Sequence, residues 1–231
     1  MSKSIRKTII GSGFIASKFK KKLQYYKKYN ITIYAAGISN SLEKNKKNLS
    51  REINKIKKFI KLNTKQLIYI STYSILDKSR KDKPYVKNKI IIENIIKKST
   101  NEYLIIRLPE IVGGNKNLST LTNFFYEKIN NNKSFLLFKN VRRNILDVDD
   151  AINKSIILIK KYYKKQKTIN LLNKSFYTPE KIVKTFEKIL QKKARYKKKK
   201  IINNSFNLND SYFLNSNKNY LLKVLEKYYL K

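Results

Sequence analysis

Along the first 110 residues, short continuous apolar runs alternate with segments in which apolar residues recur every three or four positions. The runs fit buried strands at 7–10, 31–36, 66–71 and 103–108. Between them, spacings of three and four, as in Leu49, Ile53, Ile56 and Ile60, predict helices over 14–26, 49–62 and 85–98. Strands that alternate with helices predict βαβ units and a parallel sheet, with a right-handed crossover in each unit.

The second half continues with helices and fewer strands. The same patterns predict strands at 135–138 and 168–172, and helices at 118–129, 149–163, 179–191 and 221–230. Thr178 is placed to cap the helix that begins at Pro179. The segment 203–219 is rich in Asn and Ser and predicts a loop.

The composition excludes several kinds of chemistry. The 231 residues include no Cys and no His. A zinc site of the usual kind, a cysteine nucleophile, a histidine base and a disulfide framework are therefore excluded, and no metal site is expected. Any acid–base catalysis must rest on Tyr, Lys, Asp or Glu.

The formal net charge is +39, from 54 Lys and Arg against 15 Asp and Glu. Such a charge suggests a polyanionic partner, but the lysines are spread over the chain, apart from the run Lys197–Lys200. The spread favours codon bias of an AT-rich genome over a nucleic-acid site. The charge also attracts nucleotide diphosphates.

No apolar run approaches the roughly 18 residues of a membrane span. The segment Lys3–Phe19 has the charge and apolar stretch of a signal peptide, but a Gly-Ser-Gly turn and Lys18 interrupt it. We therefore expect a cytoplasmic protein.

A glycine-rich turn follows the first predicted strand. Gly11-Ser12-Gly13-Phe14-Ile15-Ala16 has the pattern G-x-G-x-x-[G/A]. Such a turn lets a pyrophosphate approach the backbone at a helix N-terminus. Its place between a strand and a helix favours dinucleotide binding, and the alternative is a tight turn without a ligand.

Hydroxyl side chains follow the third predicted strand. Thr72 lies where ligands bind in a parallel sheet, outside the carboxyl ends of the strands. A hydroxyl there can bond a substrate carbonyl or alcohol. Ser71 and Ser74 are competing candidates, and each of the three hydroxyls has the alternative of capping the loop.

Tyr85 and Lys89 are four residues apart and share one face of a predicted helix. A phenol has a pKa of about 10. A nearby ammonium stabilises the phenolate and moves that pKa toward neutral pH. Taken alone, Tyr-x-x-x-Lys is an ordinary solvated helix face. The order of glycine turn, Ser-Thr strand end and Tyr-x-x-x-Lys favours catalysis.

With these motifs the sequence resembles the extended short-chain dehydrogenase/reductases, which include NAD-dependent sugar epimerases and dehydratases. Further matches run in family order over most of the chain: Ala35-Ala36-Gly37, Tyr69-Ile70-Ser71-Thr72, Ile106-Arg107-Leu108-Pro109 with Gly113, Leu146-Asp147-Val148-Asp149-Asp150-Ala151 and Thr168-Ile169-Asn170-Leu171. They are specific to the superfamily and not to one substrate.

The resemblance implies a Rossmann-like, doubly wound parallel sheet with a small C-terminal substrate-side region. Residues 1–112 would form the NAD(P)-binding core, and 113–231 the remaining core elements and the substrate side, in one compact unit.

The resemblance also implies an enzyme that uses NAD or NADP on a nucleotide-linked sugar, and a possible homodimer. Thr72 would orient the carbonyl, Tyr85 would be the acid–base and Lys89 its partner. Lys116, Arg142 and Arg143 are candidates for the substrate diphosphate. The implied cofactor contacts are Gly11, Ser12, Gly13, Phe14, Ile15, Ala36, Gly37, Lys89 and Leu108.

The chain departs from the family in one interval. Gly13 and Thr72 are separated by 59 positions, which leaves room for about one strand, since a βαβ unit takes roughly 30 residues. One or two early strands are therefore expected to be absent. The acidic residue at the end of the second strand, which would hold the adenine ribose, is expected to be absent too. The alternative function is a non-catalytic Rossmann-fold protein that binds a nucleotide or RNA.

Overall fold

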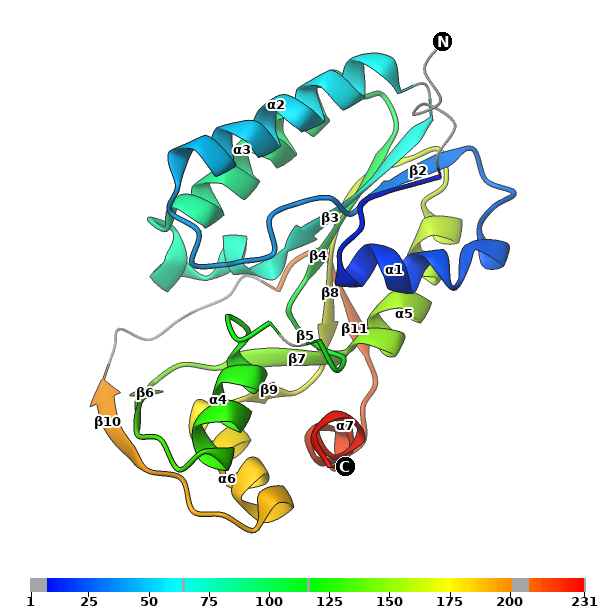
Figure 1. Cartoon of the computed structure of the whole chain (residues 1–231). Coiled ribbons are helices and arrows are strands. Elements are labelled where there is room, and N and C mark those ends of the chain that lie inside the picture. Colours follow the sequence, from blue (N-terminus) through cyan, green and yellow to red (C-terminus); the bar gives the residue numbers. More distant parts are fainter. Residues whose placement is uncertain (1–7, 64, 116, 201–207, 231) are drawn as a thin grey trace.

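A six-stranded parallel sheet forms the centre of the molecule in the computed structural model, which describes residues 8–63, 65–115, 117–200 and 208–230. The strands lie in the order β1-β2-β3-β4-β8-β11 (Figure 1). This parallel α/β sheet confirms the predicted Rossmann-like fold class. The strands span Ile9–Ile10, Ile31–Tyr34, Gln66–Thr72, Tyr103–Leu108, Gln166–Asn173 and Ser211–Leu214, respectively.

Helices cover both faces of the sheet, α1 and α5 on one face and α2 and α3 on the other (Figure 1). Side chains alternate along each strand. Ile33 and Ile68 therefore pack into the core under α1 and α5, while Tyr34 and Tyr69 pack under α2 and α3. The four helices span Phe14–Lys20, Val148–Lys161, Lys46–Leu62 and Pro84–Ser99, respectively.

The connection through α1 has the opposite hand from those through α2 and α3. β1 is the last strand at its side of the described sheet and pairs directly with β2. All three connections step the same way along the sheet, but α1 lies on the other face. The prediction that every crossover is right-handed is therefore wrong, although about 98% of such connections are. The reason is packing, because α1 buries Ala16 and Phe19 in the same core as α5.

The last strand of the sheet, β11, lies where the sequence predicts a loop over 203–219. That prediction is wrong for 211–214, while 203–207 lie outside the described residues. β11 runs parallel to β8, with Ser211 opposite Asn170 and Leu214 opposite Asn173. The Asn170 side chain donates to the backbone oxygen of Asn209, ahead of the strand. Pairing with β8, which no local pattern encodes, overrides the local preference for a loop.

A smaller lobe lies beyond the carboxyl ends of the central strands (Figure 1). Its own core packs α4, α6 and α7 against a three-stranded sheet of β5, β7 and β9 and a parallel pair of β6 and β10. The helices span Leu121–Asn130, Pro179–Leu190 and Tyr220–Tyr229. The strands span Glu110–Val112, Arg143–Asp147, Phe176–Tyr177, Phe135–Lys139 and Tyr196–Lys200.

Caps explain where several helices begin. α2 begins at Lys46, earlier than the predicted 49, because the Asn45 side chain accepts hydrogen bonds from the backbone N–H groups of Lys47 and Asn48. Thr178 caps α6 as predicted, by accepting from the N–H of Lys181. α1 ends at Lys20, so the predicted helix over 14–26 is too long.

Asp147 joins three parts of the fold. Its carboxylate accepts the backbone N–H of Asp149 at 2.7 Å, at the N-terminus of α5, and Lys227 Nζ of α7 at 2.9 Å. We expect Asp147→Ala to lower the free energy of unfolding by about 1–2 kcal/mol, through loss of the helix cap and the ion pair. Urea denaturation measures this change.

The matched control is Asp82→Ala, because the side chain of Asp82 is 80% exposed. Its expected change is below about 0.5 kcal/mol. Equal losses in the two variants would contradict the role assigned to Asp147.

Candidate active site

A cavity of about 590 Å³ opens at the carboxyl ends of the central strands. It lies there because α1 leaves β1 toward one face and α2 leaves β2 toward the other, so neither helix covers the strand ends between them. The structure brings together in its wall every residue that the sequence predicts for cofactor and catalysis: Gly11, Ser12, Gly13, Phe14, Ile15, Ala36, Gly37, Thr72, Tyr85, Lys89 and Leu108.

The glycine turn between β1 and α1 forms one wall of this cavity. Gly11 has a φ of +133°, and a Cβ there would lie 2.5 Å from the backbone oxygen of Ala35. Only glycine fits this position. At Gly13, by contrast, an added Cβ would meet nothing within 4 Å. The space above Gly13 is open for a ligand to approach the backbone.

The three candidate hydroxyls differ in their partners. Ser71 is buried and donates to Glu93 Oε1 at 2.6 Å, while Glu93 also pairs with Arg107. Ser74 Oγ accepts from Arg80 at 3.5 Å. Thr72 Oγ1 accepts the backbone N–H of Ser74 at 3.2 Å, which caps the turn after β3. This bond uses Thr72 as an acceptor and leaves its own O–H proton available for a ligand.

Tyr85 and Lys89 lie in the first two turns of α3, which begins at Pro84. Both side chains are buried, at 7% and 2% exposure. Lys89 Nζ lies 5.4 Å from the centroid of the Tyr85 ring, so the two groups lie together, as Tyr-x-x-x-Lys on a helix predicts. The ammonium therefore lies close enough to stabilise negative charge on the Tyr85 phenol.

Lys89 has a partner that the sequence analysis missed. Glu52 Oε1, from α2, accepts its Nζ at 2.6 Å, and both side chains are at most 4% exposed. The signal was present, because Glu52 occupies an inward position of α2 together with the apolar residues Leu49, Ile56 and Ile60. A carboxylate on the buried stripe of a basic helix indicates a buried cation opposite it.

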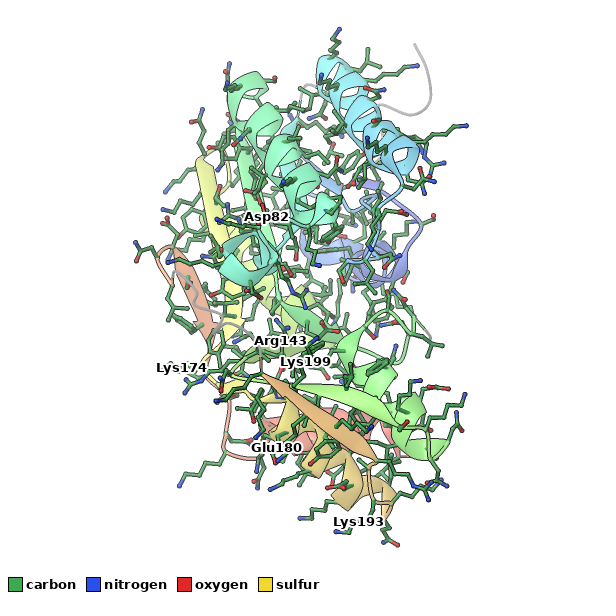
Figure 2. The ribbon with its side chains drawn as sticks, turned by 90° about the vertical axis from the view of Figure 1, so that its left-hand side faces the viewer. Asp82, Arg143, Lys174, Glu180, Lys193 and Lys199 are labelled. Carbon is green, nitrogen blue, oxygen red and sulfur yellow. The ribbon has the colours of Figure 1, made fainter. Side chains whose placement is uncertain are left out.

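Arginines surround the part of the cavity nearest the small lobe. Arg143 Nη1 lies 3.1 Å from Asp77 Oδ2, and Arg80 Nε lies 3.6 Å from the same oxygen. Arg142 also lines the cavity, whereas Lys116 lies outside the described residues. Figure 2 shows Arg143 midway between Asp82, ahead of α3, and Glu180, at the start of α6. Arg80 was not predicted.

Acidic residues are few in the described cavity wall. They are Asp77, paired with arginine, and Glu110, whose carboxylate accepts the backbone N–H of Leu121 at 2.8 Å. Burial raises the pKa of the Glu110 carboxyl above its usual range, although Leu121, Arg80 and Arg143 act to lower it.

The described parts of the chain contain neither a candidate metal site nor a candidate membrane-spanning helix. Three or more acidic side chains nowhere gather there into a group that could hold a metal ion. Within the same residues, every helix is too short or too polar to cross a membrane.

The raised pKa of Glu110 predicts a dependence of stability on pH. Glu110 keeps its proton to higher pH in the folded chain than in the unfolded chain, so its ionisation costs stability as the pH rises above about 4.3. Glu110→Gln keeps an oxygen for the Leu121 N–H and removes the ionisation. We expect the variant to gain stability relative to the wild type between pH 4 and pH 7, measured by urea denaturation.

Glu127→Gln is the control with the opposite sign. A bond from Lys133 is the largest of several effects that lower the pKa of Glu127. Its variant should lose stability relative to the wild type as the pH rises through that range. The same trend in both variants would contradict the assignment.

Comparison with known proteins supports the fold. The sequence matches no model of a known protein family and no curated protein. Solved structures do match. The structure of UDP-glucuronic acid 4-epimerase from Bacillus cereus, in complex with UDP-glucuronic acid and NAD, has a TM-score of 0.64 at 18% identity, over 94% of this chain and 74% of the epimerase.

Two further structures agree over most of their own length. UDP-N-acetylglucosamine 4-epimerase from Bacillus cereus has a TM-score of 0.66 at 16% identity, over 96% of this chain and 94% of its own. dTDP-4-dehydrorhamnose reductase from Bacillus anthracis, in complex with NADP, has a TM-score of 0.65 at 13% identity, over 94% and 85%. The chain therefore has the fold of these epimerases and reductases, as its resemblance to the extended short-chain dehydrogenase/reductases implied.

Proposed function

We propose that this protein is an NAD(P)-dependent enzyme that acts on a nucleotide-linked sugar as an epimerase, dehydratase or reductase. One observation carries the proposal. Thr72, Tyr85 and Lys89 line the same cavity as the open glycine turn at Gly13. This combination supports oxidation or reduction at a sugar carbon next to a bound dinucleotide. The similar structure of UDP-glucuronic acid 4-epimerase contains NAD, and that of dTDP-4-dehydrorhamnose reductase contains NADP.

The cavity wall fits a dinucleotide at its pyrophosphate and nicotinamide end. The open space above Gly13 would receive the pyrophosphate against the backbone of Gly11, Ser12, Phe14 and Ile15. Ala36, Gly37, Lys89 and Leu108 would hold the nicotinamide half. When bound, the cofactor supplies the hydride chemistry at the sugar carbon. The two carboxylates of the described wall, Asp77 and Glu110, contact Arg143 and Leu121 of the small lobe, so neither is placed to select NAD against NADP.

In this proposal the chain itself moves the proton. The Tyr85 phenolate takes the proton of the sugar hydroxyl during oxidation, and the Tyr85 phenol gives a proton to the carbonyl oxygen during reduction. The Lys89 ammonium, 5.4 Å from the Tyr85 ring centroid, stabilises the negative charge that develops on the phenol. The Thr72 hydroxyl donates to the same substrate oxygen and orients it.

The substrate diphosphate lies at the arginines of the small-lobe end. Arg80 and Arg143 both reach into the cavity from elements that flank Asp77, and Arg142 lines it beside them. Guanidinium groups bind phosphate oxygens through two parallel hydrogen bonds. This end of the cavity is therefore suited to a nucleoside diphosphate, the group that UDP-glucuronic acid carries in the similar epimerase structure.

A cytoplasmic location and a homodimer stay predictions from the sequence. The competing function is a non-catalytic protein that binds a nucleotide or RNA, an alternative motivated by the +39 net charge and the short interval before Thr72. NADH fluorescence separates the two functions. Cofactor binding below millimolar concentration supports the enzyme. Absence of NADH and NADPH binding, with RNA binding that weakens steeply with salt, supports the alternative.

Tyr85→Phe tests the proton step. The variant loses one hydroxyl, so we expect kcat to fall roughly 10²- to 10⁴-fold in the sugar substrate assay, with the melting temperature almost unchanged. A screen of nucleotide sugars with both cofactors supplies that assay. The matched control is Tyr103→Phe, because Tyr103 begins β4 at the end of the strand away from the cavity. Wild-type turnover in Tyr85→Phe would show that another group moves the proton.

Gly13→Val tests the dinucleotide site. The open space at this position lets the folded chain accept the larger side chain, which then occupies the place of the pyrophosphate. We expect the dissociation constant for NADH to rise roughly tenfold or more, which corresponds to about 1.4 kcal/mol. Ser17→Val, on the exposed side of α1, should leave it unchanged. An unchanged constant in Gly13→Val would place the cofactor elsewhere.

A further inference from the structure

The ammonium of Lys89 is held by the carboxylate of Glu52, which accepts hydrogen bonds from three donors. Glu52 Oε1 accepts Lys89 Nζ at 2.6 Å and the backbone N–H of Ile38 at 3.2 Å. Its other oxygen accepts Asn88 Nδ2 at 2.9 Å. Glu52 is only 5% exposed, so water does not compete for these bonds. The carboxylate is therefore fixed, and it fixes Lys89.

Gly37 closes this pair from the cavity side. A Cβ at Gly37 would lie 2.6 Å from Lys89 Nζ and 2.8 Å from Glu52 Oε1. Any side chain at this position would displace the ion pair. The glycine that the family resemblance assigns to cofactor binding thus also has a second task, which is to leave room for the lysine and its carboxylate.

The pair faces several titratable groups. Tyr85 lies on α3 with Lys89, Tyr69 comes from β3 with its hydroxyl 3.4 Å from Lys89 Nζ, and Tyr34 comes from β2. Lys55 of α2 lines the same cavity. Tyr85 lines the same cavity as the glycine turn.

Burial alone would favour the neutral amine. Burial acts to lower the pKa of Lys89, but Tyr69, Tyr85 and Glu52 together raise it above its usual value. Lys89 Nζ lies 5.4 Å from the centroid of the Tyr85 ring, so a change of charge at Lys89 also acts on Tyr85. A negative charge held against this pair makes removal of its first proton harder, and loss of that charge makes it easier.

We propose that Glu52 is a positioning residue that holds the Lys89 ammonium beneath Gly37 and sets the pH at which Tyr85 exchanges its proton. This inference rests on the proposed function, because it assigns Tyr85 the proton step. Glu52 itself touches neither substrate nor cofactor. It acts through Lys89, and its carboxylate shifts the working range of Tyr85 toward higher pH.

The test reads Tyr85 directly in the protein without ligands. Tyrosine labelled with ¹³C at Cζ gives one NMR signal per residue, and Tyr85→Phe identifies the signal of Tyr85. We expect Glu52→Gln to move the titration midpoint of that signal to lower pH by about one unit. The acidic limb of the kcat profile should move in the same direction once a substrate is in hand.

Glu93→Gln is the matched control. Glu93 is also a buried carboxylate on a buried cation, with Arg107 Nη2 at 2.7 Å, and it lies on the same helix as Lys89. Its variant removes one buried charge of the same kind, whose buried cation is Arg107 instead of Lys89. We expect a shift of the Tyr85 midpoint no larger than a third of that in Glu52→Gln.

Each outcome decides the inference. An unchanged midpoint in Glu52→Gln, a shift to higher pH, or an equal shift in Glu93→Gln overturns it, even if turnover is found. The expected shift supports it even if no nucleotide sugar is turned over, which would defeat the proposed function alone. Should Glu52→Gln fail to fold, Glu52→Asp replaces it, because the shorter side chain draws the charge away from Lys89. This variant must give a smaller shift of the Tyr85 midpoint in the same direction. Absence of that shift overturns the inference.

Discussion

The candidate site depends on one constraint, the switch of helices between the two faces of the sheet after β1 and β2. Because α1 packs with α5 and α2 packs with α3, the ends of these two strands stay uncovered. The usual doubly wound sheet obtains such a crevice by reversing its strand order. Among the described residues the strand order β1-β2-β3-β4-β8-β11 does not reverse, and the crevice arises through a connection of opposite hand instead. A shortened sheet can thus keep a cavity at the carboxyl ends of its strands.

Within that crevice, the free-energy cost of burying the Lys89 charge determines how the side chains around it are arranged. An ammonium removed from water must be paired, and Lys89 is paired with Glu52 on one side and faces Tyr85 on the other. The ion pair thus joins α2, α3 and the loop that carries Gly37 into one rigid wall. The position of the Lys89 ammonium thus depends on a helix, α2, that carries no recognisable motif.

The strongly basic composition has a structural counterpart. The chain has few acidic residues, and several of them lie inside as partners of Lys or Arg: Glu52 with Lys89, Glu93 with Arg107, Asp77 with Arg143 and Asp147 with Lys227. Acids used in this way fix helices, strand ends and the cavity wall. They leave the surface with little to balance its lysines, so a long-range attraction for anions follows from the architecture as well as from the count.

The sequence by itself determined the βαβ order, the glycine turn, and the placing of Tyr85 and Lys89 on one helix face, because these features depend on local periodicity and on spacing along one element. It also indicated the shortened interval before Thr72. Only the tertiary structure decided the hand of the first crossover, the strand β11 and the pairing of Glu52 with Lys89. Each of these depends on contacts between segments far apart in the chain, where packing and charge burial outweigh local preference.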